Sequence, residues 1–153
     1  MGQTEKGVPF SSIDQIGIIV RDLDRAVKYY ESLGIGPFKP LEHITPTERI
    51  VRGKIVTDVK NKMMFARAGP VQLELIQPIE GDSIQKEFLE MMGEGVNHFG
   101  FFVDDIEKET ANLVKKGFKV VESVKFKEGG GVAHFDTDEV GGILFELIQT
   151  SPK

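Results

Sequence analysis

The string "QLELIQP" occupies residues 72–78, and "LFELIQT" occupies residues 144–150. The four letters Glu-Leu-Ile-Gln therefore occur twice, beginning at Glu74 and at Glu146, 72 positions apart (146 − 74 = 72). If the sequence around them repeats as well, the two glutamates occupy equivalent places in a duplicated unit. The sequence upstream of each copy tests that idea.

The upstream strings are "QIGIIVRDLDRAVKYY" from Gln15 and "HFGFFVDDIEKETANL" from His98. In register they share three residue types, at Gly17 and Gly100, Val20 and Val103, and Asp22 and Asp105. The first unit is 59 residues from Gln15 to Glu74 (74 − 15), and the second is 48 from His98 to Glu146 (146 − 98). We interpret the repeat as a duplication, with 11 extra residues (59 − 48) inserted in the first unit, within 37–61.

Each unit predicts the same order of elements. A short apolar run fits a buried strand, and the aspartate after it fits a helix N-cap. A glycine typical of a helix end follows, then three strand-like runs. These runs are "RIVRGKIV", "KMMFARA" and "VQLELIQ" in the first unit, and "KVVESVKF", "GVAHFDT" and "GILFELIQ" in the second. The pattern in both units is βαβββ.

The predicted fold is α+β, with paired βαβββ modules forming a cup-shaped mixed sheet and helices on its outside. We expect one compact domain in four parts: an N-terminal tail at 1–12, a first module at 13–80, a linking helix at 81–94 capped by Asp82 or Ser83, and a second module at 95–150.

Alternation along the strands predicts which side chains enter the cup. If the apolar set Ile16, Ile18 and Val20 packs on a helix, then Gln15 points inward. The same argument turns three further polar side chains inward, namely Glu74, His98 and Glu146.

An amide, an imidazole and two carboxylates in one hollow suit a divalent cation. Two buried carboxylates repel each other, and a +2 charge cancels them. Oxygen ligands with one imidazole fit Zn, Co, Ni, Mn or Mg. The chain has no cysteine, which excludes a thiolate site, a disulfide framework and a cysteine nucleophile. A single Gln or His in a strand is more often a core or surface residue, and so we interpret His43 and His134.

Composition excludes other classes. A formal charge of −5 with scattered lysines and arginines gives no footprint for nucleic acid, and no apolar run approaches a membrane span. We therefore expect a cytoplasmic protein with a frayed N-terminus and a small-molecule substrate.

The pattern resembles the vicinal oxygen chelate superfamily from about Ile13 to Gln149. The stretches "GEGVNHFGFFVDDIEKETANLVKKGFKVV", "GGGVAHF" and "GGILFELIQ" are similar to those of methylmalonyl-CoA epimerases. The resemblance implies a homodimer and one divalent ion, whose four ligand positions fall on Gln15, Glu74, His98 and Glu146. Many epimerases have His at the first position, so this ligand set is closer to that of zinc-type glyoxalase I.

Two chemistries are implied, and both remove a proton next to a metal-polarised carbonyl. Glyoxalase I grips glutathione with side chains at positions that are Ile19, Pro78 and Glu94 here, which speaks against a lyase. The epimerase reading implies an acyl-CoA or other thioester, with Glu146 as ligand and base. Its second acid comes from a variable segment, where "LEHITPTERIV" offers Glu42 or Glu48, and we choose Glu48.

A non-catalytic alternative also stays open. Some members of the superfamily bind a small aromatic molecule without a metal, although they usually lose ligand residues. An extradiol dioxygenase fits less well, because it needs two histidines and one carboxylate for iron, and Gln15 replaces one histidine.

Overall fold

The computed structural model describes residues 10–150. The elements follow in the order β1 (Gln15–Ile19), α1 (Leu23–Ser32), β2 (Pro46–Val51), β3 (Lys54–Val56), β4 (Lys60–Ala68), β5 (Val71–Glu80), α2 (Ile84–Met92), β6 (Gly95–Phe102), α3 (Ile106–Lys115), β7 (Val120–Phe126), β8 (Gly131–Phe135) and β9 (Leu144–Gln149). Most of the tail expected at 1–12 lies outside the described residues. The helices found within 10–150 are all too short or too polar to cross a membrane.

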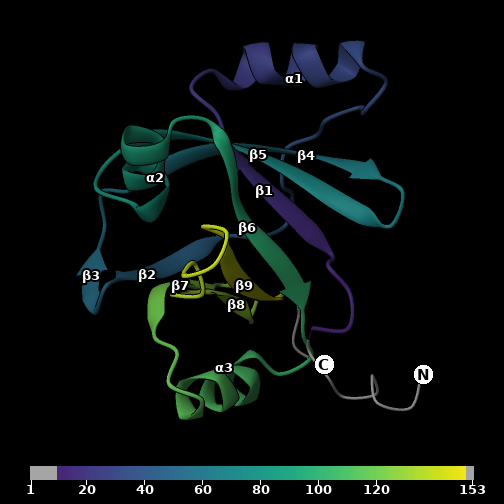
Figure 1. The fold of residues 1–153 in the computed structure, drawn as a ribbon. Helices are drawn as coiled ribbons and strands as arrows, with labels where there is room; N and C mark the ends of the chain where they lie inside the picture. Colours follow the sequence, from purple (N-terminus) through teal and green to yellow (C-terminus); the bar gives the residue numbers. More distant parts are fainter. Residues whose placement is uncertain (1–9, 151–153) are drawn as a thin grey trace.

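The strands form one curved sheet in the order β3-β2-β7-β8-β9-β6-β1-β5-β4. Within it, β1 runs parallel to β5, and β6 runs parallel to β9. The two halves meet where β1 pairs antiparallel with β6. Figure 1 shows α1 and α3 far apart, at opposite ends of the molecule. The predicted pairing of two similar units around a cup is confirmed.

The two equivalent helices begin in the same way. Asp22 accepts a hydrogen bond from the backbone N–H of Arg25, and Asp105 accepts one from Lys108, both at 3.1 Å. The last residue of each Glu-Leu-Ile-Gln string adds a second cap. Gln77 accepts from the N–H of Leu23 at 2.9 Å, and Gln149 accepts from the N–H of Ile106 at 3.0 Å. Each repeat therefore ties its last strand to the start of its helix, where backbone donors lack helical partners.

Each helix covers its own apolar cluster on the convex side of the sheet. Val20, Leu23, Phe38, Ala66 and Leu75 form the cluster under α1, with Ile18 packed against it. A second cluster lies under α3, formed by Phe101, Leu113, Ala133, Phe135 and Leu147. Ile18 and Val20 therefore face the helix, as the alternation predicts, and the other face of β1 is free for the hollow.

The run "RIVRGKIV" departs from expectation. It was predicted as a single strand of the first unit, but it turns back at Arg52 and Gly53, where φ is +48° and +82°. The resulting β2–β3 hairpin joins the second half, because β2 pairs antiparallel with β7. The hairpin spans Pro46–Val56, 11 residues (56 − 46 + 1), inside the range expected for the insertion. At the first unit's own edge, the isolated bridge between Lys39 and Phe65 is the one pairing found beside β4 within residues 10–150.

The linking helix α2 is capped by Ser83, one of the two predicted caps. The Ser83 hydroxyl accepts from the N–H of Lys86 at 3.0 Å. The helix brings the buried side chain of Gln85 to the cavity described below.

Candidate metal centre

The seam between β1 and β6 positions the first two polar side chains. Across it, Gln15 pairs with Gly100 and Gly17 pairs with His98. A Cβ at Gly17 would overlap the ring of His98, and a Cβ at Gly100 would lie 2.9 Å from the Cβ of Gln15. Each shared glycine therefore leaves the space that the polar side chain of the other half occupies.

The glutamates come from the strands that flank the seam. Glu74 on β5 pairs with Gly17, and Glu146 on β9 pairs with Gly100. The two carboxylates thus approach the seam from opposite sides in matched registers. All four side chains are buried, with residues 1–7% exposed.

Their ligand-type atoms converge on one point. His98 Nε2 lies 2.9 Å from Gln15 Oε1, 3.3 Å from Glu74 Oε1 and 3.1 Å from Glu146 Oε1. Gln15 Oε1 lies 3.2 Å from Glu74 Oε1 and 3.0 Å from Glu146 Oε1. Ligands about 2.1 Å from an ion and at right angles are about 3.0 Å apart. Five of the six distances among these atoms therefore match neighbouring corners of an octahedron.

Further hydrogen bonds orient the two nitrogen-bearing groups. Asn97 Oδ1, which is buried, lies 3.2 Å from His98 Nδ1. An amide oxygen can only accept, so Nδ1 carries a proton and Nε2 faces the cluster, where a metal ion would take the place of the second ring proton. Gln15 Nε2 donates to Gln72 Oε1 at 2.8 Å, which turns the Gln15 oxygen toward the carboxylates. Turning that amide over would give the carboxylates donors, but would set two amide oxygens 2.8 Å apart.

The pKa shifts of these side chains show that a positive charge stabilises the cluster. Burial alone lowers the pKa of His98, but Glu146 and Glu74 outweigh it and raise the pKa to about 10. Burial raises the pKa of Glu74, and the nearby Glu146 carboxylate adds to that effect. Burial also raises the pKa of Glu146, yet His134 and His98 outweigh it and hold that pKa below its usual range. A divalent cation would supply the charge that a proton on His98 otherwise provides.

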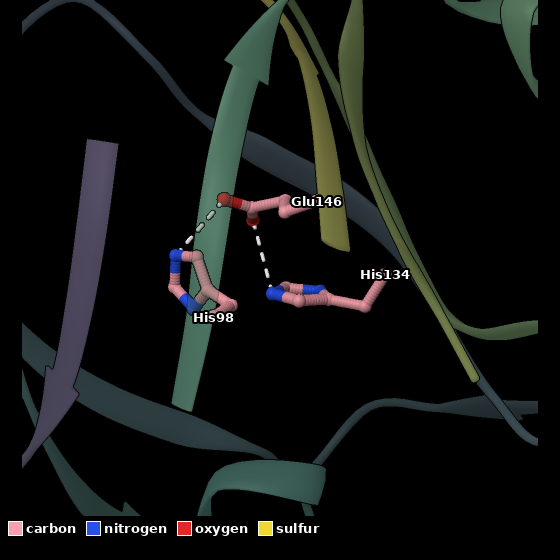
Figure 2. A group of neighbouring side chains, drawn as sticks. All are labelled: His98, His134 and Glu146. Carbon is pink, nitrogen blue, oxygen red and sulfur yellow. Dashed lines mark ion pairs between the residues drawn. The ribbon is translucent and has the colours of Figure 1, made fainter. Parts of the chain in front are cut away.

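His134 joins the same cluster from β8, as Figure 2 shows. Its Nε2 lies 3.2 Å from Glu146 Oε2, and its ring meets that of His98 edge to face with centroids 5.0 Å apart. His98, His134 and Glu146 form a second group that could hold a metal ion. His134 was interpreted as an ordinary strand or surface residue; it is 3% exposed and faces the centre.

A cavity of about 150 Å³ opens onto these side chains from the concave face of the sheet. Apolar side chains make up much of its wall, among them Leu41, Ile44, Met63, Phe65, Phe102 and Val124. The lining also includes polar residues from β2, β4, α2 and β7, namely Arg49, Asn61, Gln85 and Glu122. The hollow can therefore hold a small, mostly apolar group with its polar end on the cluster.

The sequence matches the family model of the Glyoxalase/Bleomycin resistance protein/Dioxygenase superfamily over residues 14–135. The chain belongs to this superfamily.

Relatives in the superfamily carry different names. The uncharacterized protein YqjC of Bacillus subtilis is 27% identical over 140 residues, covering 90% of this chain and 91% of that protein. A probable chloroplastic lactoylglutathione lyase of Arabidopsis thaliana is 28% identical over 135 residues, covering 87% of this chain but only 34% of that protein.

Solved structures agree with the fold. The hypothetical protein BH1468 from Bacillus halodurans is 23% identical, with a TM-score of 0.66 over 93% of this chain and 96% of that one. Methylmalonyl-CoA epimerase of Streptomyces coelicolor, in complex with 2-nitronate-propionyl-CoA, is 26% identical, with a TM-score of 0.63 over 90% of this chain and 96% of that one.

Of the residues predicted for a superfamily active site, four are brought together and one is not. The four proposed ligands meet at the seam. Glu48 lies on β2 with its carboxylate 3.7 Å from Lys125 Nζ, and it is not among the residues that line the cavity. Its neighbour Arg49 does line the cavity. His43 is fully exposed, with a side chain 93% accessible.

Proposed function

We propose that the chain is a metal-dependent isomerase of the methylmalonyl-CoA epimerase type. It would remove and return a proton on the carbon next to an acyl thioester carbonyl. The observation that carries the proposal is the convergence of Gln15, Glu74, His98 and Glu146, with interatomic distances of 2.9–3.3 Å. The metal is one divalent ion, and oxygen and imidazole ligands suit Zn, Co, Ni, Mn or Mg.

Different residues of the chain would bind the metal, remove the proton and exclude water. A bound divalent ion would polarise the substrate carbonyl oxygen and so acidify the neighbouring C–H. Glu146 is the proposed base, since His134 and His98 keep its pKa low and the carboxylate ionised. The apolar wall of the cavity excludes water from the reacting carbon. The thioester tail would leave through the open mouth, because about 150 Å³ is too small for a whole acyl-CoA.

Inversion at a carbon needs a second acid on the opposite face. Glu48 remains our predicted second acid, and because it points to the face of β2 opposite Arg49, that role requires β2 to rearrange so that the carboxylate leaves Lys125 and reaches the cavity. A homodimer also remains a prediction.

A glyoxalase-type lyase is the second candidate. It is favoured by the types of the four proposed ligands, which resemble the zinc-type glyoxalase set, and by the likeness to a probable lactoylglutathione lyase. The side chain at Glu94 is itself acidic and would repel a glutathione carboxylate, and its own carboxylate accepts from the backbone N–H of Arg21 at 2.8 Å.

Hydrogen exchange in heavy water tests the proposal. The metal-loaded chain is incubated with a panel of acyl-CoA thioesters, methylmalonyl-CoA included, and deuterium at the carbon next to the carbonyl is followed by mass spectrometry. We expect exchange with at least one thioester, lost on chelation. Turnover of methylglyoxal with glutathione and no exchange would replace the isomerase by the lyase. Tight binding of an aromatic ligand with neither metal nor turnover would indicate a binding protein.

A further inference from the structure

A second polar group lines the cavity apart from the four proposed ligands. Glu122 on β7 is the central residue of this polar group, and it is 1% exposed. Arg49 NH1 donates to Glu122 Oε2 at 2.6 Å, and Gln85 Nε2 donates to Glu122 Oε1 at 3.1 Å. Asn61 Nδ2 donates in turn to Gln85 Oε1 at 3.4 Å. His134 Nδ1 lies 3.4 Å from Glu122 Oε1, which joins this group to Glu146.

The charge of Arg49 is already used. Among the described residues that line the cavity, Arg49 is the only lysine or arginine, and Glu122 holds it in a largely buried ion pair. A substrate carboxylate at this wall would meet a cation that is neutralised and a carboxylate that repels it. Breaking the pair to free the arginine would leave Glu122 buried and unpaired, which is strongly unfavourable.

Two side chains of the wall keep unused hydrogen-bonding capacity. Asn61 Oδ1 is buried without a partner. Both ring nitrogens of His134 also lack a well-aligned hydrogen bond, although the residue is 3% exposed. The His134 nitrogens each lie beside a carboxylate oxygen, at 3.4 Å from Glu122 and 3.2 Å from Glu146, so Asn61 Oδ1 is the atom that lacks any partner. Buried polar atoms in folded proteins nearly always have partners, and because Asn61 lines the cavity, a ligand bound there can supply one. Arg49 still has N–H donors beyond the one on Glu122.

We propose that Arg49, Asn61, Gln85, Glu122 and His134 form a second subsite that binds an uncharged group able both to donate and to accept, such as a hydroxyl or a primary amide. Such a group donates to Asn61 and accepts from Arg49. A carboxylate can only accept, which leaves the Asn61 oxygen unpartnered.

The inference deepens the proposed function and rests on it for the identity of the substrate. The substrate is then an acyl thioester whose acyl chain carries a neutral polar group, in place of the second carboxylate of a malonyl-type thioester. The subsite itself is a binding property and is measurable without turnover.

Malonate and its monoamide are the probes. Both keep one carboxylate for the ligand cluster and differ only in the group that reaches the wall. Affinities are measured by calorimetry on the metal-loaded and the metal-free chain, and the side-chain amide resonances of Asn61 and Gln85 are followed by NMR. We expect the wild type to bind the monoamide at least about tenfold more tightly than malonate. Malonate would leave the buried Asn61 oxygen without a partner, and such a loss costs about that much.

Three variants locate the effect. Glu122→Gln frees the guanidinium and should move the preference at least tenfold toward malonate. Asn61→Leu removes the orphan acceptor with little change in volume and should lower the preference for the monoamide without altering charge. Glu87→Gln is the matched control, because Glu87 holds Arg52 at 2.8 Å in an exposed pair and should leave the ratio unchanged.

The outcomes separate the two proposals. A wild type that prefers malonate, or that binds neither probe saturably, overturns the subsite. So does an unchanged ratio in both Glu122→Gln and Asn61→Leu. Failure to exchange any thioester, on a chain that binds a divalent ion and shows the expected ratio of probe affinities, overturns the proposed function alone. Faster exchange of methylmalonyl-CoA than of a hydroxylated acyl-CoA overturns the subsite and leaves the isomerase standing.

Discussion

The imidazole of His98 fills the space that a side chain at Gly17 would occupy. The two residues face each other across the β1–β6 seam, and a Cβ at position 17 would overlap three atoms of the ring. The seam therefore tolerates no side chain beside this proposed ligand. The glycine is needed for the site as well as for the strand.

Substitution of Gly17 by alanine tests this relationship. We expect a loss of about 1–3 kcal/mol of stability from overpacking, together with loss of bound divalent ion, because His98 must move. Urea unfolding and elemental analysis measure the two effects. Gly95→Ala is the control, since its Cβ would lie 4.0 Å from the nearest atom, on Phe88. A Gly17→Ala chain that binds metal as the wild type does contradicts the proposed role of His98.

Two substitutions decide which group of side chains holds the ion. If Gln15 and Glu74 complete the site, Gln15→Ala weakens metal binding at least tenfold, while His134→Asn keeps it near the wild-type value. If the ion lies on His98, His134 and Glu146, the two results are exchanged. X-ray absorption of the cobalt-loaded chain gives an independent count, and we expect one imidazole rather than two.

Saturating metal distinguishes the proposed base, Glu146, from Glu74, which is proposed to act only as a ligand. Glu74→Gln should lose metal affinity and regain most of its hydrogen exchange when metal is saturating. Glu146→Gln should stay about 10²–10⁴-fold below the wild type at any metal concentration, because it also removes the base. Recovery of both variants at saturating metal would mean that Glu146 is only a ligand.

The repeat explains why the convergence of the four proposed ligands was predictable from sequence. Gln15, Glu74, His98 and Glu146 occupy matched places in two copies, and alternation along the strands sends them to one face. His134 gave no such signal. It lies on β8 and pairs with Glu146, and the residue in the equivalent place of the first unit is Phe65 on β4, which pairs with Glu74. A residue without a polar counterpart escapes an argument from duplication.

The pairing of strands between the two halves was equally unpredictable from the sequence. Nothing local in "TPTERIV" indicates that β2 joins β7 of the other half, yet that pairing brings Arg49 to Glu122. Glu48 and Arg49 are adjacent in the sequence and point to opposite faces of the strand, so a choice between them depends on that register. The cap by Gln77 was likewise unforeseen, because the repeated glutamine contacts a helix more than 50 residues away.

The repeated glutamines supply a stability prediction. Gln77→Ala and Gln149→Ala each remove the acceptor for the first N–H of a helix, and each should cost about 1 kcal/mol in urea unfolding. The two losses should add in the double variant, because the helices lie at opposite ends of the molecule. A double variant as stable as the wild type would show that water replaces both caps.

The stability of the metal-free chain should fall as the pH rises. The ordinary pKa of His98 is 6.5, and the surrounding carboxylates raise it to about 10 in the folded chain. The folded chain therefore keeps a proton that the unfolded chain releases, so its stabilisation is complete below pH 6.5 and is lost as the pH rises through about 10. Melting temperatures in a chelator from pH 6 to 10 should decline, and His98→Gln should remove most of that slope. Because a divalent ion takes the place of the proton, metal uptake at pH 8 should release about one proton per ion. Uptake without proton release would show that the ion binds away from His98.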